Sequence, residues 1–179
     1  MIHLKCQDIV VREFEEKDIE NKVKWINDPK NNEYLHYDLP LEYEKTLLWY
    51  QNKAQNRLDC VIEYDDIPVG LVGLISIDNV SLKAEFYISM GETTYKGKGI
   101  ATTATKLLLQ YAFKVLNLNK IYLNVDEENS IACRLYQKCG FRKEGRFEKD
   151  LWHRGRLINR LRYAIFAEDF REYYSQSTK

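Results

Sequence analysis

The sequence is poor in the residues that mark fibrous, low-complexity or membrane-spanning chains. Its 179 residues include only 8 glycines and 3 prolines, which excludes collagen-like and proline-rich repeats. No segment approaches the about 18 uninterrupted apolar residues of a membrane helix, and the N-terminus has no apolar core of a secretory signal. We therefore expect a cytoplasmic protein with one folded domain over residues 1–179 and a polar tail from about residue 175.

Cysteine is also scarce, and its spacing excludes two common uses. The four cysteines include no Cys-x-x-Cys pair and no spacing that suits a zinc site. We expect them to be small buried hydrophobic residues in a reducing compartment. The sequence therefore predicts neither a disulfide nor a metal ion.

The chain as a whole has no excess of either charge, but its first half is acidic and its second half is basic. The chain has 27 basic and 27 acidic residues, whereas a dedicated nucleic-acid-binding domain is normally strongly basic. Residues 1–90 carry 10 basic and 17 acidic side chains, and residues 91–179 carry 17 and 10. This asymmetry favours an anionic ligand bound by the second half. Two solvated faces of opposite sign would give the same count.

The hydrophobic pattern predicts an α/β domain with alternating strands and helices. Period-two patterns and turn signals predict strands at 9–14, 60–64, 69–77, 82–90, 121–125, 146–152 and 160–166. Helical spacing predicts helices near 19–27, 40–53, 100–115 and 129–138. The order of these elements indicates a sheet with helices packed against it.

A glycine-bearing stretch, Lys96-Gly97-Lys98-Gly99-Ile100-Ala101, joins a strand to a helix. Such a junction presents free backbone N–H groups to an anion. The spacing does not fit a Walker loop, because Gly99 follows Lys98 where a hydroxyl residue is required. It does not fit the dinucleotide fingerprint either, because Thr102 stands where Gly or Ala is required. An ordinary tight turn before a helix is the alternative.

The same stretch resembles the pyrophosphate loop of the GNAT N-acetyltransferases, Arg/Gln-x-x-Gly-x-Gly/Ala, at Gly99 and Ala101, with Lys96 in place of Arg or Gln. A second segment, residues 129–145, is similar to the family's Asn…Ala…Leu-Tyr-Glu-Lys-x-Gly-Phe…Gly pattern. The resemblance is to the branch of ribosomal-protein, polyamine and amino-sugar acetyltransferases. It implies a GNAT-type fold with a mixed, mostly antiparallel sheet of about six or seven strands, and acetyl-CoA as co-substrate without a metal.

The resemblance also implies which residues bind acetyl-CoA. The pantetheine arm would lie along Phe86, Tyr87 and Ile88, where this strand splays from 121–125, and a backbone N–H near Ile88 would polarise the thioester carbonyl. The diphosphate would bind the loop. Asn129 is either a cofactor contact or only a helix cap. The expected cofactor-binding residues are Phe86, Tyr87, Ile88, Lys96, Gly97, Lys98, Gly99, Ile100, Ala101 and Asn129.

Two residues are candidates for the chemistry. Tyr136 matches the position at which many family members place the acid that meets the departing thiolate. Because the reference pKa of tyrosine is about 10 and that of a thiol is about 8.5, hydrogen-bond donation is favoured over complete proton transfer. A core tyrosine is the alternative. Glu85, on the polar face of its strand, is the candidate general base, with an ordinary surface carboxylate as the alternative.

His36, Tyr37 and Trp49 are the candidate acceptor-binding residues, although lone aromatic residues are more often packing residues. The acceptor is expected to be a small amine, an amino sugar or a peptide N-terminus. The acidic first half favours a cationic acceptor, whereas the arginine-rich C-terminal hairpin favours an anionic one. A catalytically silent CoA-binding regulatory module is the alternative function. We expect no membrane or nucleic-acid partner, and we consider a homodimer.

Overall fold

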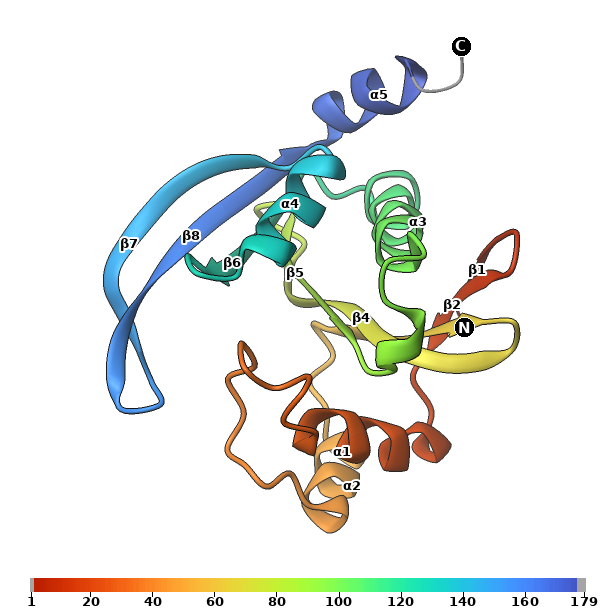
Figure 1. Ribbon diagram of the computed structural model, residues 1–179. Coiled ribbons are helices and arrows are strands. Elements are labelled where there is room, and N and C mark those ends of the chain that lie inside the picture. The colour runs from red at the N-terminus through yellow and green to blue at the C-terminus, as the bar shows by residue number, and fades with distance from the viewer. Residues whose placement is uncertain (1, 177–179) are drawn as a thin grey trace. The chain divides into compact units, whose positions relative to one another are not determined.

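The structure is a computed structural model that describes residues 2–176 (Figure 1). These residues form, in chain order, β1 (His3–Cys6), β2 (Ile9–Glu13), η1 (Glu16–Asp18), α1 (Ile19–Asn27), α2 (Tyr43–Gln51), β3 (Leu58–Tyr64), β4 (Ile67–Asp78), β5 (Lys83–Met90), η2 (Thr93–Tyr95), α3 (Ile100–Lys114), β6 (Lys120–Asp126), α4 (Ser130–Lys138), β7 (Arg142–His153), β8 (Arg156–Phe166) and α5 (Ala167–Gln176).

The strands follow the order β1-β2-β3-β4-β5-β6-β8-β7 in one mixed sheet. The β5–β6 pair is parallel, whereas the pairs on either side of β3 and β8 are antiparallel. The predicted α/β class with a mostly antiparallel sheet is confirmed. The expected six or seven strands are wrong, because residues 2–176 form eight. The extra strand is β1, whose four residues are mostly exposed and give no hydrophobic alternation.

Contacts divide the described residues into two compact units. Unit 1 contains the residues up to Ile75 and Tyr87–Leu108, and unit 2 contains Ser76–Phe86 and the residues from Leu109 onward. The single domain expected from the sequence stays a prediction. Helix α5 includes residues 175 and 176 of the expected polar tail, and residues 177–179 lie outside the described part.

In unit 1, α1 and α2 lie side by side (Figure 1) over an apolar cluster. Ile19 and Trp25 of α1 are both buried, Ile19 on the apolar face that the helical spacing predicts. They belong to a buried core cluster with Phe14, Val61 and Leu71, against which Val23, Leu47, Trp49, Tyr50 and Tyr87 pack. This packing fixes the side chains of α2 and β5 that concern the candidate site.

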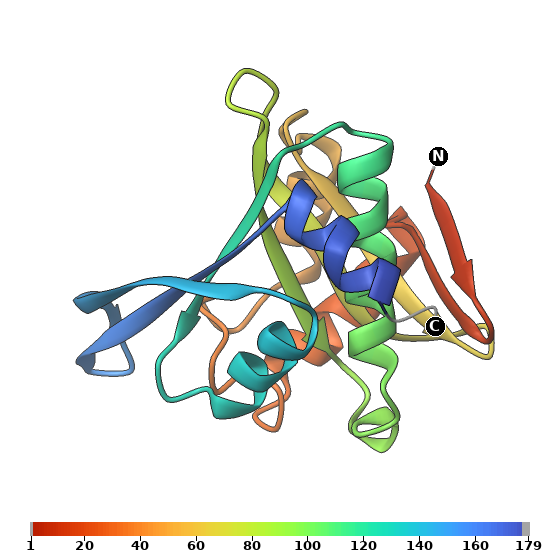
Figure 2. The same ribbon diagram turned by 90° about the horizontal axis from the view of Figure 1, so that it is seen from above.

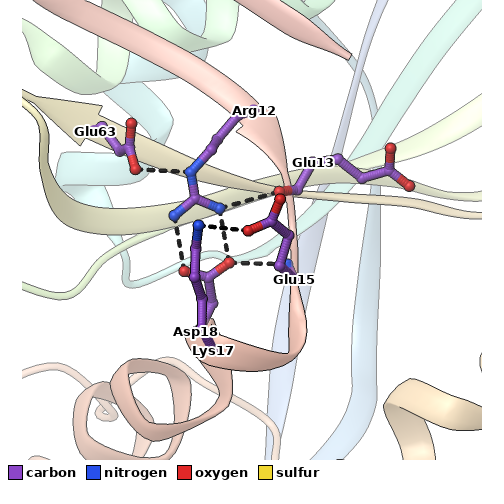
Figure 3. A network of polar contacts seen from close by, with 6 residues as sticks. All are labelled: Arg12, Glu13, Glu15, Lys17, Asp18 and Glu63. Atoms are coloured by element: carbon purple, nitrogen blue, oxygen red, sulfur yellow. Dashed lines mark hydrogen bonds and ion pairs between the residues drawn. The ribbon is translucent and has the colours of Figure 1, made fainter. Parts of the chain in front are cut away.

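A polar network fixes the start of α1 to the sheet (Figure 3). The Arg12 guanidinium donates to both oxygens of Asp18 at 2.7 and 2.8 Å and to Glu63 at 2.7 Å. Asp18 also accepts from the backbone N–H of Glu15 at 2.8 Å. The hydrogen bond to Asp18 is the main cause that raises the pKa of Arg12. The network therefore joins β2, β3 and η1 while satisfying a half-buried cation.

In unit 2, β6 pairs with β8 over seven residues, and β7 and β8 form a long hairpin (Figure 2). Ile121, Leu123 and Ile165 are fully buried in this unit. Both hairpin strands extend beyond their predicted bounds, to Arg142 on one side and Arg156 on the other. The added residues 142–145 of β7 are mostly exposed and not apolar, whereas those of β8 include the exposed Leu157 and the buried Ile158, which the sequence pattern did not assign to the strand.

The cysteines only partly follow the expectation of burial. Cys60 and Cys139 are buried, whereas Cys6 is exposed at the end of β1. Burial raises the pKa of the Cys60 thiol to about 12.

Within the described residues, no helix combines the length and the apolar composition needed to cross a bilayer.

Candidate functional site

In unit 1 the glycine loop leads directly into the N-terminus of α3. Gly97 and Gly99 have φ values of 83° and 78°, in the left-handed region that glycine adopts without steric cost. The N–H of Thr103 donates to the carbonyl of Gly99 at 3.0 Å, and the N–H groups that precede it have no acceptor inside the helix. An added Cβ at either glycine would meet no atom within 4 Å. The loop is therefore open to a ligand.

Two aromatic rings position one lysine of this loop. The ammonium of Lys98 lies 5.5 Å from the ring centroid of Tyr64 and 5.2 Å from that of Tyr95. Lys96 donates to Asn31 Oδ1 at 3.1 Å. Both cations are thus held beside the loop. Neither tyrosine was predicted to contact Lys98, because Tyr64 lies far from the loop in the sequence.

The polar face of β5 in unit 1 carries Tyr87, whose hydroxyl donates to Asp59 Oδ1 at 2.7 Å. A Cβ on Gly73 would lie 2.5 Å from the Tyr87 ring, so glycine is required there. Arg57 donates to both oxygens of Asp59 at 2.7 Å. Burial favours the neutral carboxyl, but the hydrogen bonds from Arg57 and Tyr87 outweigh it and hold the pKa of Asp59 below 3.8. Asp59 is therefore a buried carboxylate.

Two of the three expected acceptor-binding residues approach this carboxylate. The Trp49 ring on α2 lies 5.0 Å from the guanidinium carbon of Arg57. Tyr37 is 42% exposed as a residue, but desolvation of its hydroxyl raises its pKa, and Asp59 adds to that shift. The structure places His36 on the exposed loop before α2. Trp49 therefore belongs to one polar cluster with Arg57 and Asp59, and the charge of Asp59 also acts on Tyr37.

In unit 2, Glu85 is part of a chain of hydrogen bonds. The amide of Asn124 donates to Glu85 Oε1 at 3.2 Å, and its carbonyl oxygen accepts from Arg162 Nε at 3.1 Å. The guanidinium of Arg162 lies 4.6 Å from the centroid of Tyr122, which is the parallel neighbour of Glu85. The candidate base is thus half-buried and oriented by an amide, a feature that the sequence analysis did not identify.

Tyr136, on α4 of unit 2, is 7% exposed. Its ring contacts Phe86 edge-on at 6.3 Å, Phe141 at 5.8 Å and Tyr163 at 6.4 Å. No described residue forms a hydrogen bond with its hydroxyl. Among the described residues no fully enclosed side-chain oxygen or nitrogen lacks a hydrogen-bond partner, so this hydroxyl is not fully enclosed. Burial raises its pKa above the usual 10, which keeps the hydroxyl protonated.

Asn129 is the N-cap of α4, as expected from the sequence. Its side-chain oxygen accepts from the backbone N–H of Ala132 at 3.1 Å, which satisfies one of the free donors of the first turn. The capping geometry agrees with one of the two uses considered for this residue, and a cofactor contact stays a prediction. Ile88, on the part of β5 in unit 1, is half-buried.

Residues 8–142 match the model of the family described as the acetyltransferase (GNAT) domain. The chain belongs to the GNAT acetyltransferase family. The spermidine N(1)-acetyltransferase of Escherichia coli K12 is 43% identical to this GNAT protein over 110 residues, which span 62% of this chain and 59% of that enzyme. The putative ribosomal N-acetyltransferase YdaF of Bacillus subtilis is 26% identical over 92% of this chain and 94% of its own length.

Solved structures agree with the family assignment. The crystal structure of the spermidine N-acetyltransferase from Vibrio cholerae in complex with CoA and spermine superimposes with a TM-score of 0.84 at 29% identity. The match covers 92% of the present GNAT protein and 99% of that chain. The predicted GNAT-type fold is therefore confirmed.

The most unusual group of this GNAT protein outside the predicted residues is Lys22 of α1. It is 7% exposed, and its ammonium lies 3.4 Å from the centroid of Trp49 and 5.7 Å from that of Phe14. Desolvation lowers the pKa of Lys22 to about 8 although Asp59 attracts the charged form. The helical pattern of α1 gave a signal for this burial, because Lys22 shares a face with Ile19 and Ile26.

We predict that Lys22→Met stabilises the protein at pH 7. Because the pKa is lower in the folded state than in the unfolded one, the folded protein binds fewer protons between pH 8 and 10.5, and wild-type stability gains ~3 kcal/mol across that range relative to the variant. Urea unfolding at a series of pH values should show an advantage for Lys22→Met of order 1–3 kcal/mol at pH 7 that shrinks towards pH 10.5. An equal difference in unfolding free energy between the two proteins at pH 7 and at pH 10.5 would contradict the lowered pKa of Lys22. Cys60 titrates in both proteins, so its effect cancels.

Proposed function

We propose that this protein transfers the acetyl group of acetyl-CoA to a primary amine. The observation that carries this proposal is the open N-terminus of α3, where Gly97 and Gly99 bring backbone N–H groups to the surface. Such N–H groups and the helix dipole favour anions. The diphosphate of acetyl-CoA is an anion of this kind, and Lys96 and Lys98 add positive charge. Membership of the GNAT family supports the proposal.

The remaining contacts to the co-substrate come from β5 and α4. The ladder between β5 and β6 ends at the pair Glu85↔Tyr122, so the backbone from Phe86 onward lies past the last pair. We assign the pantetheine arm to Phe86, Tyr87 and Ile88, with the N–H of Ile88 polarising the thioester carbonyl. Asn129 caps α4 and is assigned a second use as a contact to CoA.

Two side chains are assigned to the chemical step. The attacking amine has to be neutral, and Glu85 takes its proton as general base. The Asn124 amide that donates to Glu85 holds the carboxylate in one orientation. The hydroxyl of Tyr136, protonated and without a protein partner among the described residues, donates a hydrogen bond to the departing CoA sulfur.

The acceptor is assigned to the part of unit 1 that holds His36, Tyr37 and Trp49. The relatives are named for spermidine and for a ribosomal substrate, and both classes contain primary amines. A small amine, an amino sugar and a peptide N-terminus all fit the proposed reaction. The cytoplasmic location and a homodimer stay predictions from the sequence.

The direct test is thiol release from acetyl-CoA by the purified protein with a panel of amines, followed by mass analysis of the products. We expect thiol to appear only when an amine is present, with one acetyl group gained per thiol released. A protein that binds CoA tightly but releases no thiol with any amine would instead be the silent CoA-binding module. The two outcomes differ in turnover and share the binding step.

A further inference from the structure

Lys22 has an ammonium group that the protein itself does not satisfy. No described residue gives it a hydrogen bond or an ion pair, and its nitrogen lies 3.4 Å from the ring centroid of Trp49. Because no fully enclosed side-chain nitrogen of the described residues lacks a partner, this nitrogen is not fully enclosed by the protein. A lysine that is 93% buried with three free donors is costly to fold. Its position is therefore suited to an anion.

The nearby carboxylate is not available to Lys22 as a hydrogen-bond partner. Both oxygens of Asp59 are taken by Arg57, and Oδ1 also accepts from Tyr87. Arg57 lies over the same Trp49 ring as Lys22. Its Nη1 has no hydrogen bond to any residue within the described part of the chain. Lys22 and Arg57 together with Asp59 leave one uncompensated positive charge around that ring.

We propose that Lys22 and the Nη1 of Arg57 bind an anionic group, carboxylate or phosphate, on the acceptor amine. The proposal rests on the proposed acetyl transfer and specifies the substrate class. An anion of one charge would neutralise the cluster and form charge-assisted hydrogen bonds with both cations.

The same cluster disfavours a polyamine. A second ammonium group of such an acceptor would meet Lys22 and Arg57, which repel it. The net acidity of residues 1–90 favoured a cationic acceptor, but that count describes the whole half of the chain and not the surroundings of Trp49. The local charge therefore selects the anionic alternative of the two that the sequence left open.

The test compares acceptors that differ in the anionic group, and each kcat/KM is referred to the concentration of neutral amine. Glucosamine 6-phosphate against glucosamine tests phosphate, and glycine against glycinamide tests carboxylate. We expect kcat/KM to be at least about tenfold higher for the anionic member of one pair than for its neutral partner, and we expect the difference to lie in KM. Spermidine should have a lower kcat/KM than that anionic acceptor. In Lys22→Met this ratio should fall towards one. Lys17→Met, at an exposed lysine that pairs with Glu15, is the matched control and should keep the ratio.

Calorimetry of the same acceptors with the CoA-loaded protein separates this proposal from the proposed function. Tighter binding of an anionic acceptor that is lost in Lys22→Met supports the subsite even when no acetyl transfer occurs. Acetyl transfer with equal kcat/KM within both pairs, or with a preference that survives in Lys22→Met, overturns the subsite and leaves the acetyltransferase intact. Unfolding curves of each variant confirm that the protein is folded.

Discussion

Gly99→Glu is expected to raise the Kd for CoA by more than about 100-fold. The residue has φ +78°, and its Cβ direction is open, so the new carboxylate would occupy the position proposed for the diphosphate and repel it. Losing two charge-assisted bonds from backbone N–H groups costs at least ~3 kcal/mol. The helix itself should persist, because an acidic residue at its N-terminus interacts favourably with the dipole. Isothermal titration with CoA measures the change.

The chain supplies a matched control at Gly155 in the turn between β7 and β8. Gly155 has φ +82°, and a Cβ there also meets nothing within 4 Å. Gly155→Glu therefore introduces the same backbone strain and the same charge outside the glycine loop. Its affinity for CoA should stay within about twofold of the wild type. Equal affinity in Gly99→Glu and the wild type would remove the loop from the binding site.

The fold could be predicted wherever the hydrophobic pattern had a clear period. The alternation in β5 and the helical spacing in α3 both placed their elements correctly, because one face of each is buried. The pattern failed at β1, whose residues are mostly exposed. The predicted bounds of β7 were also too short, because ten of its twelve residues are polar or exposed. Backbone pairing alone extends these strands, and hydropathy does not report it.

The candidate site likewise has parts that the sequence predicts and parts that it does not. The glycine loop and the cap at Asn129 depend on local backbone geometry, which short motifs encode directly. The cluster joins Lys22 of α1 with Asp59 of β3 and with Arg57, the residue just before β3, and only the fold brings them together. The charged residue Asp59 in the largely apolar strand β3 was a signal in the sequence that a polar site lies here. The sequence did not show which side chains Asp59 contacts, so the kind of site could not be predicted.

Tyr136→Phe is expected to lower kcat by roughly 100-fold while the Kd for CoA changes little, as when one hydrogen-bond donor to a developing charge is removed. Phenylalanine keeps the ring contacts with Phe86, Phe141 and Tyr163, so unfolding should be nearly unchanged. Because burial raises the pKa of Tyr136, proton transfer to a thiolate is even less favourable than for a free tyrosine. Stopped assays under saturating acetyl-CoA and amine measure kcat.

Tyr163→Phe removes a hydroxyl from the same ring cluster and distinguishes catalysis from packing. Tyr163 is 3% exposed, and its hydroxyl accepts from Gln137 at 3.4 Å, so it is already engaged within the protein. Its loss should affect stability more than kcat. If both variants retained the wild-type kcat, Tyr136 would be a core residue. If only Tyr136→Phe is slow, the reaction uses the hydroxyl of Tyr136, and the elevated pKa then identifies a hydrogen-bond donor that keeps its proton.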